Sequence, residues 1–150
     1  MNSFYLVIEL LRSQLAKDID VNTITHGVVN NVDIDKKNIF PLAHIGIVSS
    51  PIQDGVILFS FEIHVLDQRN ISKKPVTDKF LGNDNELDNL NTCHAVLNRL
   101  ITWLKLQRND YDIELVSASE LLPVQFDFTN ILDGWYSTVQ VSIPNNIIVC

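Results

Sequence analysis

The N-terminal part of the chain shows an apolar pattern with helical spacing over residues 4–17. Apolar side chains recur there every three or four positions, at Phe4, Val7, Ile8, Leu11 and Leu15. This spacing places them on one side of a helix, and the polar residues between them fall on the other side. Ser3 directly precedes the pattern and is expected to cap the helix. The pattern therefore predicts an amphipathic helix with one buried face.

The clearest strand pattern covers residues 40–67. Residues 40–49 form an extended apolar run, and residues 50–55 have the composition of a turn. The run covers residues 56–67, and from residue 57 to 65 its odd-numbered positions are apolar and alternate with a mixed set. Leu58 and Leu66, together with Tyr136 from the last third of the chain, are therefore expected on a mostly polar, exposed face. The two runs predict a long antiparallel hairpin.

A second helical pattern spans about residues 85–107. Its expected inward positions are Leu87, Leu90, His94, Leu97, Ile101 and Leu104, widened by Cys93, Val96 and Leu100. Asn83, Asp84 and Asn85 precede the pattern as candidate caps. At 1.5 Å per residue the predicted helix is roughly 35 Å long, which is enough to cross a sheet.

The last third of the chain returns to strand patterns. Residues 113–117 and 121–128 predict two short extended segments, and residues 135–144 alternate between apolar and polar positions. The order of elements is therefore helix, hairpin, long helix and further strands. This order predicts an α+β fold in which two main helices pack on one face of an antiparallel β-sheet.

Long connections extend this predicted core. A polar arm covers about residues 18–38, in which residues 21–26 form either a short edge strand or part of the arm. A polar loop covers about residues 68–84, and residues 145–150 form an apolar tail. Connections of this length are uncommon in compact domains unless they are functional or ordered by a partner. A length of 150 residues fits a single domain that carries these extensions.

Composition and charge argue against several classes of protein. The net charge of -7 and a pI of about 4.8 disfavour a free-standing nucleic-acid binder, which needs an excess of Lys and Arg. Two cysteines, Cys93 and Cys150, provide no disulfide framework and suit a reducing compartment. The apolar run over residues 4–11 is interrupted by Glu9 and is too short to span a membrane, so neither a signal peptide nor a membrane partner is expected.

No catalytic or cofactor-binding pattern stands out in the sequence. Neighbours on a helix point about 100° apart, so Cys93 and His94 do not form a catalytic pair, and both are expected in the core. His44 and His64 lie on the two predicted hairpin strands, but their spacing matches no zinc motif, and exposed or interface histidines are expected instead. The sequence contains no phosphate-binding glycine motif and no nucleophile elbow. We therefore expect a non-enzymatic protein without metal or cofactor.

A local reversal of charge marks residues 69–79, which hold four of the eleven cationic residues of this acidic chain. The loop is either a solvated mobile segment or a contact for an acidic partner surface or for nucleic acid. Together, the arm, the loop and the tail supply the residues that we expect at subunit or partner interfaces. They are Asn30, Asp33, Asp35, Lys36, Lys37, Arg69, Lys73, Lys74, Lys79, Ile148 and Cys150.

Several segments resemble one known family. They are, in chain order, IFPLAHIGIVSS, the turn PIQDG, the strand VILFSFEIHVLD, the segment GNDNELDNLNTCHAVLNRLITWL and the closing segment FTNILDGWYSTVQVSIPN. With these segments, the chain from Phe4 to Asn145 resembles the tail-terminator and head-to-tail joining proteins of tailed bacteriophages. The last two segments are similar to ring-forming neck proteins of short-tailed phages, including crAss-like phages.

The resemblance implies a structural virion protein of the neck or tail, present in the host cytoplasm during assembly. It implies a homo-oligomeric ring, hexameric or dodecameric, that connects the portal to other neck or tail proteins. DNA would pass through the channel of this ring without sequence-specific binding. Two alternatives remain open: a small adaptor or assembly chaperone that binds a protein partner outside the virion, and a minor enzyme such as a nuclease or hydrolase.

Overall fold

The structure is a computed structural model that describes residues 2–28, 39–70, 77–82, 84–106, 111–127 and 131–145. Two helices lie in these ranges, α1 (Ser3–Ala16) and α2 (Glu86–Lys105). The strands are, in chain order, β1 (Thr23–His26), β2 (Leu42–Ser49), β3 (Ile52–Gln53), β4 (Val56–Gln68), β5 (Glu114–Ala118), β6 (Leu122–Asp127) and β7 (Leu132–Pro144).

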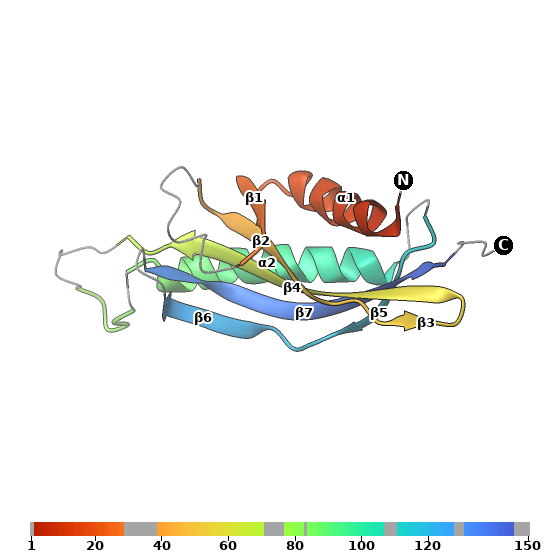
Figure 1. The fold of residues 1–150 in the computed structure, drawn as a ribbon. Coiled ribbons are helices and arrows are strands. Elements are labelled where there is room, and N and C mark those ends of the chain that lie inside the picture. Colours follow the sequence, from red (N-terminus) through yellow and green to blue (C-terminus); the bar gives the residue numbers. More distant parts are fainter. Residues whose placement is uncertain are drawn as a thin grey trace.

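All seven strands belong to one sheet, whose main order is β1-β2-β4-β7-β5 (Figure 1). β4 and β7 pair antiparallel along their whole length, from Val56 opposite Pro144 to Gln68 opposite Leu132. β3 pairs with β4 at the tip of the hairpin. β5 and β6 both pair with β7, along the edge of β7 that faces away from β4. β1 runs parallel to β2, whereas the other described pairs are antiparallel. The fold is α+β with a mostly antiparallel sheet, as the element order predicts.

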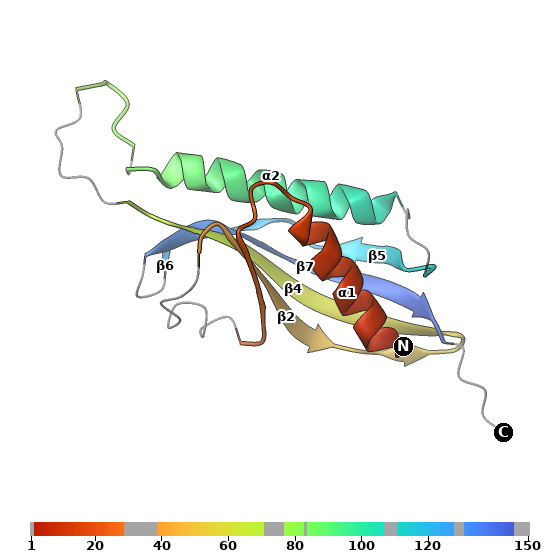
Figure 2. The same cartoon turned by 90° about the horizontal axis from the view of Figure 1, so that it is seen from above.

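Both helices cover the same face of this sheet, and α2 runs along its length (Figure 2). Buried side chains of the two helices meet the odd-numbered residues of β4 and β7 in one main core. Its members include Val7, Leu11, Leu15, Phe59, Phe61, Ile63, Val65, Cys93, Val96, Leu97, Leu100, Ile101, Leu104, Val139 and Val141. Because successive residues of a strand point to opposite faces, the period-two pattern read from the sequence accounts for the strand side of this core.

The opposite face of the sheet holds a second, smaller core. Leu42, Leu66, Val124 and Leu132 are buried there, and Phe40 and Tyr136 pack against them. The prediction that Leu58 and Leu66 are exposed on this face is wrong, since 7% of Leu58 and none of Leu66 is accessible. For Leu66 the physical reason is that β2, β6 and β7 bring apolar residues from distant parts of the chain to the same face as β4.

The hairpin, the long helix and the N-terminal helix are confirmed with small shifts at their ends. Ser3 is the first residue of α1 rather than its cap, because Asn2 occupies the cap position. Residues 21–26 contain the short edge strand β1, so the strand alternative is the correct one. β7 begins at Leu132, earlier than the predicted start at Trp135.

The inward face of α2 differs from the prediction in its first half. Leu87 and His94 are exposed, and Glu86 and Asn89 are buried in their place. His94 packs at the surface against Trp135, with ring centroids 5.3 Å apart. Glu86 and Asn89 face the sheet because both bind polar groups at the end of β4.

Gly134 comes so close to β4 that an alanine there is expected to destabilise the fold. A Cβ atom at Gly134 would meet the backbone carbonyl of Val65, and that carbonyl is held in the β4–β7 ladder. We expect Gly134→Ala to lower the free energy of unfolding by at least about 2 kcal/mol, measured by urea denaturation.

Gly46→Ala provides the matched control for this substitution. A Cβ atom at Gly46 would lie 3.3 Å from the carbonyl oxygen of Glu62, a tight contact that a small shift relieves. Its expected cost is below about 1 kcal/mol. Equal unfolding free energies for Gly134→Ala and the natural chain would contradict the close approach of β7 to β4.

Candidate functional site

Two of the residues expected at interfaces, Arg69 and Lys79, lie within the described part of the chain. Lys79 is exposed in the segment before α2. Arg69 is directed into the protein, with 7% of its side chain accessible, and forms intramolecular ion pairs. It therefore does not extend an exposed basic patch with the loop lysines. The other candidates lie outside the described residues: Asn30, Asp33, Asp35, Lys36, Lys37, Lys73, Lys74, Ile148 and Cys150.

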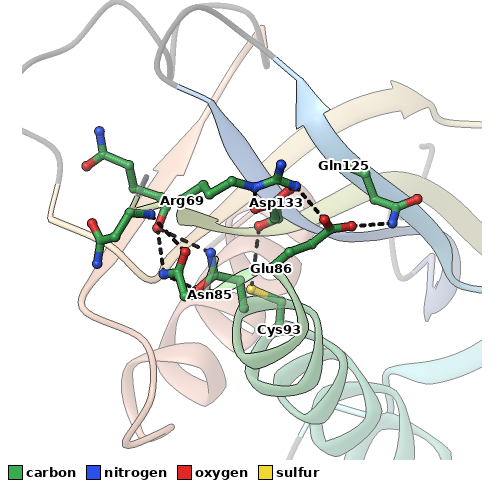
Figure 3. A network of polar contacts seen from close by, with 9 residues as sticks. Arg69, Asn85, Glu86, Cys93, Gln125 and Asp133 are labelled. Carbon is green, nitrogen blue, oxygen red and sulfur yellow. Dashed lines mark hydrogen bonds and ion pairs between the residues drawn. The ribbon is translucent and has the colours of Figure 1, made fainter. Parts of the chain in front are cut away.

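Arg69 anchors a buried polar cluster at the end of β4 (Figure 3). Its Nε donates to Asp133 Oδ2 at 2.9 Å, and its Nη2 donates to Asp133 Oδ1 at 2.7 Å. Nη2 also lies 2.9 Å from Oε2 of Glu86. The other carboxylate oxygen of Glu86 accepts a hydrogen bond of 2.6 Å from Gln125. The cluster therefore joins the end of β4 to β7, α2 and β6.

Amide side chains hold the first turn of α2 beside this cluster. Asn85 and Asn89 each donate to the carbonyl oxygen of Gln68, at 3.3 and 3.2 Å. Asn85 Oδ1 accepts a hydrogen bond of 2.8 Å from the N–H of Asn70. These bonds satisfy backbone groups where the β4 ladder ends, and they fix the rotation of the helix start.

The electrostatics of the cluster fit a structural role. Hydrogen bonds to Asp133, partly opposed by burial, raise the pKa of Arg69, so the guanidinium stays charged. Burial, together with the charges of Asp67 and Asp133, raises the pKa of the Cys93 thiol. Since the thiolate is the nucleophilic form, Cys93 is a poor nucleophile. The arrangement stabilises the junction of four elements and contains no activated nucleophile.

The two hairpin histidines meet on the sheet face opposite the helices. His44 and His64 are direct partners in the β2–β4 register, with ring centroids 6.4 Å apart. His64 also stacks on Tyr136 of β7, at a centroid distance of 4.8 Å. Both histidines are buried, so the expectation of exposed histidines is wrong. Within the ranges that the structure describes, no group of three or more His, Cys, Asp or Glu residues is placed to hold a metal ion.

Sequence reasoning missed the acidic members of the Arg69 cluster, although a signal for one of them exists. Counting back in steps of two from the inward position Trp135 places Asp133 on the core face of β7. A carboxylate on an inward position requires a cationic or hydrogen-bonding partner. No comparable signal identifies Arg69 as that partner, because the two residues are far apart in the sequence.

Among the described residues, exposed apolar side chains occur in most segments of the chain, and two sets of them lie in segments toward opposite ends of β4. The first group, which we term the tip surface, consists of Ile47 and Val48 on β2 and Ile52 on β3. The second, the loop surface, consists of Phe80 and Leu81 before α2 and Leu87 in its first turn. Figure 1 shows β3 and the segment 77–82 at opposite ends of the molecule.

No protein-family model matches the chain, and the search of curated proteins found no significant match. No helix in the described ranges is long and apolar enough to cross a membrane. A functional interpretation therefore depends on the residues of this chain and on the geometry described above.

Removal of the Arg69 charge is expected to destabilise the protein strongly. Arg69→Met leaves Asp133 and Glu86 buried without their cation, so we expect a loss of about 3–5 kcal/mol in the free energy of unfolding, measured by urea denaturation. The combined substitution Arg69→Met, Glu86→Gln and Asp133→Asn is expected to recover part of this loss, because no uncompensated buried charge remains.

Arg99 offers a comparison, because its own side chain is half-exposed, although only 9% of the Asp18 side chain that it binds is accessible. The guanidinium of Arg99 is 2.8 Å from carboxylate oxygens of both residues, and 48% of its side chain is exposed. Arg99→Met is expected to cost less than Arg69→Met, about 1–2 kcal/mol, because only one largely buried carboxylate loses its cation. Similar losses for the Arg69 and Arg99 variants would contradict a special role for the buried cluster.

Cys93 is expected to resist alkylation while the protein is folded. Its thiol is buried and its pKa is raised, so neither access nor thiolate formation favours reaction with iodoacetamide. Peptide mass spectrometry after labelling at neutral pH should find Cys93 modified only when urea is added. Complete labelling of Cys93 in the native protein would show that α2 separates readily from the sheet.

Proposed function

We propose that this chain is a structural subunit of a homo-oligomeric ring in the neck or tail of a tailed bacteriophage. The ring would join the portal to other neck or tail proteins and surround the channel for DNA. The resemblance of five segments to head-to-tail joining proteins supports this function. The structural observation that favours it most is that two sets of exposed apolar side chains lie in different segments toward opposite ends of the sheet.

A ring of identical subunits requires two different contact surfaces on each copy, because each copy meets one neighbour on either side. The tip surface and the loop surface meet this requirement, since they consist of different residues near opposite ends of β4. Neither surface is needed to complete the main core, which the helices and the sheet already form. Their exposed fractions are high, at 73% for both Ile52 and Leu81 and 65% for Phe80. Burial between neighbouring copies would remove these side chains from water.

The charge of the chain is compatible with a channel through which DNA moves. Tight binding of nucleic acid depends on Lys and Arg side chains that neutralise phosphates. With a net charge of -7, a ring of these subunits would hold DNA weakly and would not arrest its passage. The proposal assigns no catalytic residue and no cofactor.

Native mass spectrometry of the purified chain tests the ring. We expect a closed hexamer or dodecamer for the natural sequence. The double substitution Phe80→Asp and Leu81→Asp places charges in an apolar contact and is expected to shift the population to monomers. Circular dichroism should remain unchanged, because both side chains are exposed.

Ile19→Asp is the control for these substitutions. Ile19 is 93% exposed and belongs to neither apolar surface, so the ring is expected to persist in this variant. A natural chain that stays monomeric at high concentration would contradict the ring. A monomer that binds a portal or tail protein, but is missing from purified phage particles by mass spectrometry, would favour the adaptor or chaperone alternative.

A further inference from the structure

The edge strand β1 is held to the sheet partly by the side chain of His44. Backbone pairing joins β1 only to β2 among the described strands, at four positions. His44 Nδ1 lies 2.7 Å from Thr25 Oγ1, and His44 Nε2 lies 2.8 Å from the carbonyl oxygen of Gly27. A carbonyl oxygen only accepts, so Nε2 donates to Gly27 and the neutral ring accepts from the Thr25 hydroxyl at Nδ1. One neutral imidazole therefore binds two residues at the end of β1.

His64, the partner of His44 across the hairpin, lies in a site that disfavours a second proton. Its side chain is 7% exposed, and its ring stacks on Tyr136. Its Nδ1 is buried and has no hydrogen-bond partner among the described residues. Its Nε2 lies 3.4 Å from Oε1 of Glu62, beyond good hydrogen-bond distance. A proton added at Nδ1 would have no acceptor in this arrangement.

The titratable groups around the two rings come from each adjoining strand: His26 from β1, Glu62 from β4 and Tyr136 from β7. Burial is the main cause that lowers the pKa of His44, although its hydrogen bond to Gly27 opposes the shift. Burial and the nearby His44 lower the pKa of His64 to about 4. The closed structure therefore favours two neutral imidazoles.

A cleft of about 210 Å³ borders the pair. Its lining includes Gly27 and Val28, which follow β1, together with His44, Glu62 and His64. Displacement of residues 25–28 would widen this cleft and expose more of both rings to water. It would break the two bonds of His44, the bond from the N–H of Gly27 to the carbonyl of Ile45, and the β1–β2 pairing at Thr25 and His26. Ile24 packs against the main core and would limit how far the opening extends.

We propose that His44 and His64 form an acid-sensitive latch, whose protonation releases residues 25–28 from β2 and uncovers the edge of β2 at His44 and Ile45, where β1 pairs in the closed form. Ile47 and Val48, which are already exposed in the closed form, follow this edge on β2, so opening would extend the exposed part of β2 next to the tip surface. A charged imidazole is better solvated in the open form, where water reaches both rings.

The direction of the pH dependence follows from the protons that each form binds. At a pH well above about 6.5, the ordinary pKa of histidine, both rings are neutral in either form, and the latch stays closed. As the pH falls below this value, the open form binds protons that the closed form takes up only at lower pH, near 4 for His64. Acid therefore favours opening progressively between these two values.

Hydrogen–deuterium exchange of the full chain at about pH 7.5 and about pH 4.5 tests the latch, with each rate divided by the chemical exchange rate at that pH. We expect the protection of amides in residues 24–28 to fall at least about tenfold at the lower pH. Amides of β4 and β7 should keep their protection. The variants His44→Gln and His64→Gln remove the titrating groups. In the double variant, the protection of residues 24–28 is expected to be the same at both pH values.

His94→Gln is the matched control, because His94 is exposed on α2. This variant should lose protection in residues 24–28 at low pH as the natural chain does. Thr25→Val is a further test that alters no titratable group. It removes the hydroxyl bound to His44 and is expected to lower the protection of residues 24–28 already at neutral pH. The latch is wrong if the natural chain has equal protection at both pH values, or if the double histidine variant retains the fall. Simultaneous loss in β4 and β7 would also overturn it, because the opening would then be global.

Discussion

The antiparallel pairing of β4 with β7 determines where the other elements lie. The two strands are thirteen residues long and pair over their full length, so their apolar residues form one continuous surface on the helix side. α1 and α2 cover this surface because burial stabilises by roughly 25 cal/mol per Å² of apolar area. β2 extends the ladder beyond β4, and β5 and β6 share the outer side of β7. The long ladder also explains why the two exposed apolar surfaces are so far apart.

The Arg69 cluster fixes one end of this ladder in three dimensions. Buried charges are costly, and they are tolerated here because Arg69 binds Asp133 through two short hydrogen bonds and reaches Glu86 as well. The same cluster sets the rotation of α2, since Glu86 and Asn89 face the sheet while Leu87 is left at the surface. By fixing this rotation, the ion pairs of Arg69 leave Leu87 exposed as part of the loop surface. Core architecture and candidate interface are consequently linked through one arginine.

The sheet face opposite the helices combines apolar packing with titratable groups. Leu42, Leu66 and Leu132 are buried toward one end, and His44 and His64 lie next to them. This face therefore contains a small buried core and, beside it, two buried titratable side chains. The histidines lie between the rigid β4–β7 ladder and the short edge strand β1, where local opening requires few broken bonds. A titratable pair at this boundary can influence the edge strand without disturbing the main core.

The sequence by itself determined the order and type of the main elements, because apolar spacing records whether a segment buries one face as a helix or as a strand. The hairpin over residues 40–67 and the long helix near residues 85–107 follow directly from this spacing. Tertiary structure decided which polar residues are buried and which apolar residues remain outside. Asp133 is inward by simple alternation, yet its partner Arg69 is identified only when β4 and β7 are paired. Likewise, the meeting of His44 with His64 depends on the strand register, which spacing within one segment does not encode.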